Sequence, residues 1–84
     1  MRVEVLYFAV LRERASRGRE TLELPPGAFV REARAAIAAR HPEIAALLPR
    51  VQTAVNRMVV GDDHALGDGD ELAFLPPVAG GSAR

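Results

Sequence analysis

The chain has 84 residues, enough for one domain and too few for a second hydrophobic core. Eleven basic residues balance eleven acidic ones, so no net charge attracts nucleic acid or an anionic membrane surface. The absence of cysteine excludes disulfides, a thiolate nucleophile and a cysteine-based zinc site. Because no signal-peptide pattern or bilayer-spanning apolar run is present, we expect a soluble cytoplasmic protein with no nucleic-acid or membrane partner.

The first part of the chain predicts two strands joined by a short helical turn or loop. Residues 2–8 alternate in period two, and residues 19–24 repeat the pattern before a Pro-Pro-Gly sequence at 25–27 ends it. We expect Gly18 to stop the intervening segment, residues 9–18. The alternation directs five side chains to the core, namely Val3, Val5, Tyr7, Leu22 and Leu24.

The alanine-rich segment 28–50 predicts the main helix. His41–Pro42 should interrupt it, because the residue before a proline avoids the helical conformation. Pro42 can begin a second short helix that extends to about Leu48 and is closed by Pro49. Three apolar residues of the main helix recur at helical spacing and should face the core: Val30, Ala33 and Ile37.

The last third predicts three more strands. Residues 51–56 and 57–60 are strand candidates with a tight connection at Asn56–Arg57, and residues 61–71 are rich in turn-forming residues. Residues 71–75 predict the last strand. Its Leu72 and Phe74 should face the core, and its Glu71, Ala73 and Leu75 should face outward.

These elements predict an α+β fold of the ubiquitin-like, β-grasp kind, with a helix packed on one face of a mixed sheet. We expect residues 1–75 to form the domain and residues 76–84 to form an extended, flexible tail. The long crossover should return the third strand to a place beside the first. The pattern also allows a ferredoxin-like fold with one helix not recognised.

Four apolar side chains fall on the outward parity of the strands, where water would normally be expected: Leu6, Phe8, Val59 and Leu75. An apolar cluster on an uncovered sheet face indicates a partner surface. The alternative is that residues 9–18 cover these side chains, or that they are scattered singly.

The sequence contains no active site of its own. His41 and His64 lack acid–base or metal spacing, so we place them at a helix break and in a turn. The acidic residues between 62 and 70 lack the spacing of a calcium loop, so we expect no metal site. Neither Ser16 nor Ser82 has a local base to activate it as a nucleophile.

The tail is the chemically unusual segment. Gly80 and Gly81 have no Cβ atoms, so this backbone can pass through a narrow channel to a reactive centre. Pro76 and Pro77 favour extended geometry and would make the tip project from the domain. A projecting glycine carboxylate is suited to modification by another enzyme.

Three stretches carry a resemblance: VLYFAVLRE at 5–13, AVNRMVV at 54–60 and DHALGDGDELAFLPPVAGG at 63–81. Together they resemble the small subunit of molybdopterin synthase, also called molybdopterin converting factor subunit 1, a ubiquitin-like sulfur carrier. The resemblance implies that an E1-like adenylating enzyme uses ATP to activate the glycine carboxylate and that a sulfur donor system converts it to a thiocarboxylate. It further implies a heterotetramer in which the large synthase subunit receives the tail and sulfur passes to cyclic pyranopterin monophosphate. No permanently bound cofactor is expected.

The same resemblance assigns residues. Gly81 would be the reactive terminus and Gly80 the channel residue beside it. The resemblance also implies a set of residues that bind the partners: Phe8, Arg12, Val59, Leu75, Pro76, Pro77 and Val78.

One departure is the extension Ser82-Ala83-Arg84, because the family ends at the double glycine and activation needs a free Gly81 carboxylate. We expect a protease to remove these residues; alternatively they belong to an inactive paralogue or are a cloning remnant.

Competing functions are sulfur transfer for thiamine or transfer-RNA thiolation, protein modification, and a β-grasp domain that only binds.

Overall fold

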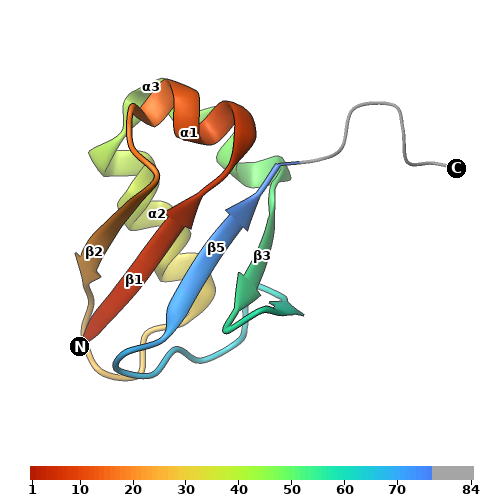
Figure 1. Cartoon of the computed structure of the whole chain (residues 1–84). Helices are drawn as coiled ribbons and strands as arrows, with labels where there is room; N and C mark the ends of the chain where they lie inside the picture. Colours follow the sequence, from red (N-terminus) through yellow and green to blue (C-terminus); the bar gives the residue numbers. More distant parts are fainter. Residues whose placement is uncertain (77–84) are drawn as a thin grey trace, which may run out of the picture.

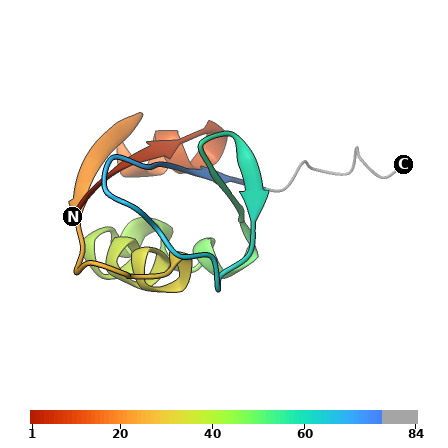
Figure 2. The same ribbon diagram turned by 90° about the horizontal axis from the view of Figure 1, so that it is seen from below.

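The protein folds as one five-stranded mixed sheet with helices against one face (Figures 1 and 2), in a computed structural model that describes residues 1–76. The elements in chain order are β1 (Arg2–Tyr7), α1 (Ala9–Ala15), β2 (Arg19–Glu23), α2 (Val30–Arg40), α3 (Pro42–Ala45), the 3₁₀ turn η1 (Leu48–Arg50), β3 (Gln52–Val55), β4 (Met58–Val60) and β5 (Glu71–Leu75). This is the β-grasp fold that the sequence predicts.

The core lies between the sheet and α2. Alternation in β1 and β5 directs every second side chain to this side, and the apolar positions of α2 meet them. Burying one such large side chain contributes about 1.5–3 kcal/mol, so these contacts hold the two layers together. The predicted core residues on these three elements are all buried: Val3, Val5, Tyr7, Leu72, Phe74, Val30, Ala33 and Ile37.

The strand order is β2-β1-β5-β3-β4, which corrects the expectation that the third strand lies beside the first. β5 runs parallel to β1 between β1 and β3 (Figure 1). The reason is burial. Leu72 and Phe74 of β5 are fully covered, which suits a central strand, whereas Met58 and Val59 of the short β4 are exposed, which suits an edge.

Two helix boundaries also differ from expectation. α1 ends at Ala15, before Gly18, because Ser16 takes the left-handed conformation at φ 59° and its N–H donates to the Glu13 carbonyl. The segment after Pro42 is not one helix to Leu48: α3 ends at Ala45, and Pro49 lies inside the 3₁₀ turn. The break at His41–Pro42 is confirmed.

Candidate functional site

The candidate site is the sheet face that α2 does not cover. Strand pairing fixes which side chains lie together there, because Leu6 of β1 is level with Ala73 of β5, and Ala73 with Ala54 of β3. Pairing extends the row to both edges of the sheet, to Arg19 of β2 and Val59 of β4. Five residues far apart in the sequence therefore form one line across all the strands.

The sheet surface is hollowed along this row because two adjacent residues of the row are alanines, whose side chains are short. Ala54 and Ala73 form the floor of a shallow hollow of about 460 Å³. Its apolar rim contains all four outward residues that strand parity identifies, Leu6, Phe8, Val59 and Leu75. The hollow presents apolar surface to solvent: Phe8 is 43% exposed and Val59 is 62% exposed. Residues 9–18 therefore do not cover these side chains, and the side chains are not scattered singly.

The chain leaves the sheet at one end of the hollow. Tyr7 is level with Phe74, so Phe8 and Leu75 follow side by side at the ends of the parallel strands β1 and β5. Pro76, which comes next, is half-buried. The other predicted tail residues, Pro77, Val78, Gly80 and Gly81, lie outside the described residues.

Arg12 lies apart from the hollow. It belongs to α1, where its guanidinium group packs against Gly18, and it lines a separate polar depression with Glu13 and Arg17. Its role in partner binding stays a prediction.

The charged rim of the hollow was not among the predicted site residues. Arg19, Arg57 and Glu71 also line the hollow. Glu71 begins β5 and Arg57 lies in the hairpin beside it, so these two are at the end away from Leu75. Arg19 has the outward parity of β2 and Glu71 that of β5, so alternation could have identified both. Arg57 lies in the turn between β3 and β4, where strand parity gives no direction for its side chain.

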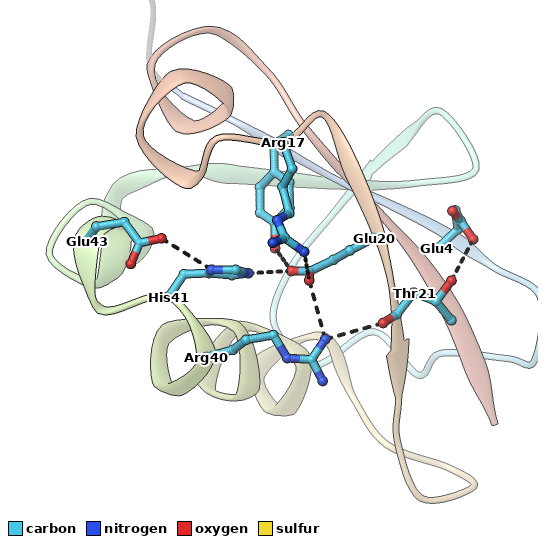
Figure 3. A network of polar contacts seen from close by, with 8 residues as sticks. Glu4, Arg17, Glu20, Thr21, Arg40, His41 and Glu43 are labelled. Carbon is cyan, nitrogen blue, oxygen red and sulfur yellow. Dashed lines mark hydrogen bonds and ion pairs between the residues drawn. The ribbon is translucent and has the colours of Figure 1, made fainter.

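A buried polar cluster joins the strands to the helices at the end of α2 (Figure 3). The Glu20 carboxylate accepts a hydrogen bond from the Tyr7 hydroxyl, and His41 Nε2 lies 2.6 Å from Glu20 Oε2. Arg17 and Arg40 approach the other carboxylate oxygen at 3.2 and 3.4 Å. The cluster therefore ties β1, β2 and the end of α2 together.

The charge state of this cluster follows from its contacts. Burial alone would raise the pKa of Glu20, but hydrogen bonds from Tyr7 and His41, together with nearby positive charge, outweigh it and hold that pKa below its usual range. Burial, with the Glu20 hydrogen bond and negative charge, raises the pKa of Tyr7. Tyr7 is thus a core residue, as predicted, and His41 stands at the helix break with a buried structural role.

Three aspartates of the loop 61–70 make contacts that stabilise the fold within the described residues. Asp62 pairs with Arg34 at 2.7 Å, Asp68 accepts the Arg2 N–H, and Asp70 accepts the Gly67 N–H. Residues 1–76 contain no cluster of three or more side chains suited to holding a metal ion. Nor does any helix among them have the length and apolar character needed to cross a membrane.

The sequence of the chain is similar to curated sulfur carriers. It is 41% identical to the molybdopterin synthase sulfur carrier subunit of Chlamydomonas reinhardtii, over 96% of this chain and 100% of that protein. It is 39% identical to the protein of the same name from Mycobacterium tuberculosis, over 96% of this chain and 99% of the relative.

Solved structures agree with the fold. SAMP1 from Haloferax volcanii superimposes with a TM-score of 0.86 at 27% identity, covering 96% of this chain and 100% of its own. A putative molybdopterin converting factor subunit 1 from Pyrococcus furiosus gives 0.84 at 36% identity, covering 93% and 99%. A chain of the complex of subunits 1 and 2 of molybdopterin-converting factor from Helicobacter pylori gives 0.71 at 27% identity, covering 96% and 100%.

The match to the family model begins at Val5, in β1, and extends to Gly81, so it includes the strands, the hollow and the double glycine. With this match and with relatives near 40% identity over almost their whole length, the chain belongs to the ThiS family.

Proposed function

We propose that this protein is a sulfur carrier in molybdenum cofactor biosynthesis. The Gly81 carboxylate attacks the α-phosphate of ATP on an adenylating enzyme and releases pyrophosphate. A donor that supplies sulfur at the oxidation level of sulfide then displaces AMP and leaves a thiocarboxylate. That sulfur is a nucleophile that bonds to cyclic pyranopterin monophosphate within molybdopterin synthase. Water then cleaves the bond between the Gly81 acyl carbon and the sulfur, which leaves the sulfur on the product and returns the carboxylate of Gly81.

The observation that carries this proposal is the position of the hollow. Phe8 and Leu75 lie where β5 ends, so a partner seated on the uncovered face is next to the chain that leads to Gly80 and Gly81. A carrier needs both features, because its partner must hold the domain and receive the reactive terminus together. The similarity to named sulfur carrier subunits supports this chemistry over other uses of the fold.

The partners follow from the same proposal. The solved Helicobacter pylori structure is a complex of subunits 1 and 2 of molybdopterin-converting factor, which supports a large synthase subunit as the occupant of the hollow. An E1-like adenylating enzyme and a sulfur donor system would act before it. We place Phe8, Val59 and Leu75 in these contacts, with Arg12 nearby and Pro76, Pro77 and Val78 leading the tail into the partner.

The extension Ser82-Ala83-Arg84 must be removed before activation, because adenylation needs a free carboxylate on Gly81. The family match ends at Gly81, which supports cleavage after this residue. We therefore include a protease among the partners.

The test is to charge the protein in vitro. The chain ending at Gly81 is incubated with its cognate adenylating enzyme, ATP and sulfide, and its intact mass is measured. We expect sulfur to replace one oxygen of the C-terminal carboxylate. The full 84-residue chain is the matched control and should remain uncharged until a cell extract has shortened it to Gly81.

A charged carrier should then convert cyclic pyranopterin monophosphate to molybdopterin when the large subunit is added. A chain ending at Gly81 that never gains sulfur would contradict the carrier function. Gain of sulfur without product would leave a carrier that serves another pathway, such as thiamine synthesis or transfer-RNA thiolation.

Protein modification is a second candidate, favoured by the close superposition on small archaeal modifier protein 1. The same activated Gly81 carboxylate would then form an isopeptide bond with a lysine of a target protein. Affinity purification of the tagged protein from its own cells, followed by mass spectrometry, would show this chain joined through Gly81 to other proteins. A carrier alone would show no such conjugates.

A further inference from the structure

The hairpin between β3 and β4 contains an unfavourable residue. Val55 pairs with Met58, so the loop is only Asn56 and Arg57, and both have positive φ, 50° and 73°. A loop of this kind prefers asparagine followed by glycine, because the left-handed conformation crowds the Cβ atom of other residues. Asn56 suits its position; Arg57 does not.

Interactions within the chain account for Asn56 but not for Arg57. The Asn56 side chain accepts the Glu71 N–H at 3.0 Å and donates to Asp70 Oδ1 at 2.9 Å. Within residues 1–76, Arg57 makes no side-chain hydrogen bond or ion pair. Backbone strain at an exposed residue with no internal compensation is a feature of functional positions.

The Arg57 side chain also lines the hollow, beside Ala54 and Val59. The other charges that line the hollow are already paired: Arg19 lies 3.1 Å from Glu4 and 3.9 Å from Glu71. Arg57 is therefore the cation of the hollow whose charge no acidic group of the described chain balances. Arg57 lies near Glu71, where β5 begins, and the tail follows Leu75, where β5 ends. Arg57 is therefore at the end of the hollow away from the tail.

We propose that Arg57 is a specificity-determining residue that binds a carboxylate of the protein docked on the hollow. This rests on the proposed function, which makes that protein the large synthase subunit. The tail would hold the partner at one end of the hollow and the ion pair at the other. Two separated contacts define the orientation in which the partner receives the tail, and an arginine can bind a carboxylate through two parallel hydrogen bonds.

The experiment measures the dissociation constant of the cognate large subunit by calorimetry, with the carrier at the same length in every variant. Arg57→Gln keeps the backbone conformation and removes the charge, and we expect binding to weaken about 5–10-fold with a smaller dependence on salt. Arg57→Lys should keep most of the affinity. Arg31→Gln is the matched control: Arg31 is an exposed arginine on α2, away from the hollow, and its loss should leave the affinity unchanged.

Arg57→Gly separates binding from folding. Glycine relieves the strained turn, so we expect the melting temperature to rise by about 2–6 °C while affinity falls as in Arg57→Gln. A purely structural Arg57 would give unchanged affinity in both variants and would overturn the proposal.

Phe8→Ala distinguishes the two levels of the argument. If Phe8→Ala weakens binding and Arg57→Gln does not, the hollow remains a docking surface and the role of Arg57 is wrong. If neither variant weakens binding, the partner does not dock on this face. The observation that supports the proposed function is then lost as well.

Discussion

The two faces of the sheet are made by the same strands but differ in what covers them. On the inner face, Tyr7 and Phe74 are buried under the helical layer, and no buried side-chain polar atom in residues 1–76 is left without a hydrogen-bond partner. On the outer face, Ala54 and Ala73 leave a hollow with Phe8 and Val59 exposed at its rim. The side chains of the inner face make their contacts within the chain. The outer face leaves apolar surface exposed, which a partner protein can cover.

This difference separates stability from binding. Substitutions on the inner face remove contacts that the isolated chain makes, so their effect is measured in the free energy of unfolding. Substitutions on the outer face remove contacts that exist only in a complex, so their effect is measured in the dissociation constant. The neighbouring residues Phe74 and Leu75 point to opposite faces and allow a direct test.

Phe74→Ala is expected to have the largest effect. The ring is fully buried and stacks against Tyr7 at 6.3 Å between centroids, so its loss should lower the free energy of unfolding by about 3–5 kcal/mol. The measurement is urea denaturation followed by circular dichroism. Leu75→Ala is the control on the opposite face and should cost less than about 1.5 kcal/mol; an equal cost for the two would contradict the distinction between the faces.

Glu20→Gln tests the polar part of the inner side. It removes the negative charge that Tyr7, His41, Arg17 and Arg40 surround, and we expect a loss of about 2–3 kcal/mol at neutral pH. Exposed Glu13, in no ion pair among the described residues, provides the control, and Glu13→Gln should change stability by less than about 0.5 kcal/mol.

The pH dependence has a definite sign. The folded pKa of Glu20 lies below its unfolded value, so its contribution is fully present above the unfolded pKa, near 4.5. It is lost as the pH falls through the folded pKa. Urea midpoints from pH 7 down to pH 3 should therefore fall more steeply for the wild type than for Glu20→Gln, and parallel curves would exclude this role.

Phe8→Ala is the corresponding test of the outer face. Because the ring is substantially exposed, its loss should change the free energy of unfolding by about 1 kcal/mol or less. If Phe8 anchors the large subunit, affinity should fall roughly 10–30-fold. Calorimetric titration measures the second effect, and unchanged affinity would contradict the proposed docking.

Strand periodicity was sufficient to predict the faces of the sheet but not the neighbours within it. Alternation alone directs Leu6, Phe8, Val59 and Leu75 to one side, and the structure brings all four to one hollow. The alanine floor could not be predicted, because it depends on the register that places Ala54 opposite Ala73. Periodicity gives the side of a strand to which a residue points and carries no information about strand order. That is why the expectation that the third strand lies beside the first is wrong.

The polar cluster shows a second limit of the sequence. Periodicity predicts Tyr7 as a core residue and also gives Glu20 the inward parity of Leu22, but it does not identify the partners that make burial of the Glu20 carboxylate favourable. Glu20 is buried because the end of α2 packs beside the edge strand β2. This packing brings His41 and Arg40 to the Glu20 carboxylate, and Arg17 approaches the same carboxylate. Contacts of this kind depend on tertiary packing, which local patterns do not encode.

Ser16→Gly is expected to have the smallest effect and sharpens the comparison at the level of the backbone. Ser16 and Arg57 both have left-handed φ angles, 59° and 73°, but Ser16 ends α1 by a regular helix stop in which its N–H donates to Glu13. Glycine is preferred there, so we expect a gain of about 0.5–1 kcal/mol, measured by urea denaturation. Ala9→Gly, at φ 51°, provides a control at the other end of α1, although its first-turn position should offset part of the gain. Glycine at either position should stabilise the protein, but only Arg57→Gly should weaken partner binding. In that case the strain at Ser16 has no role in binding, and the strain at Arg57 serves recognition.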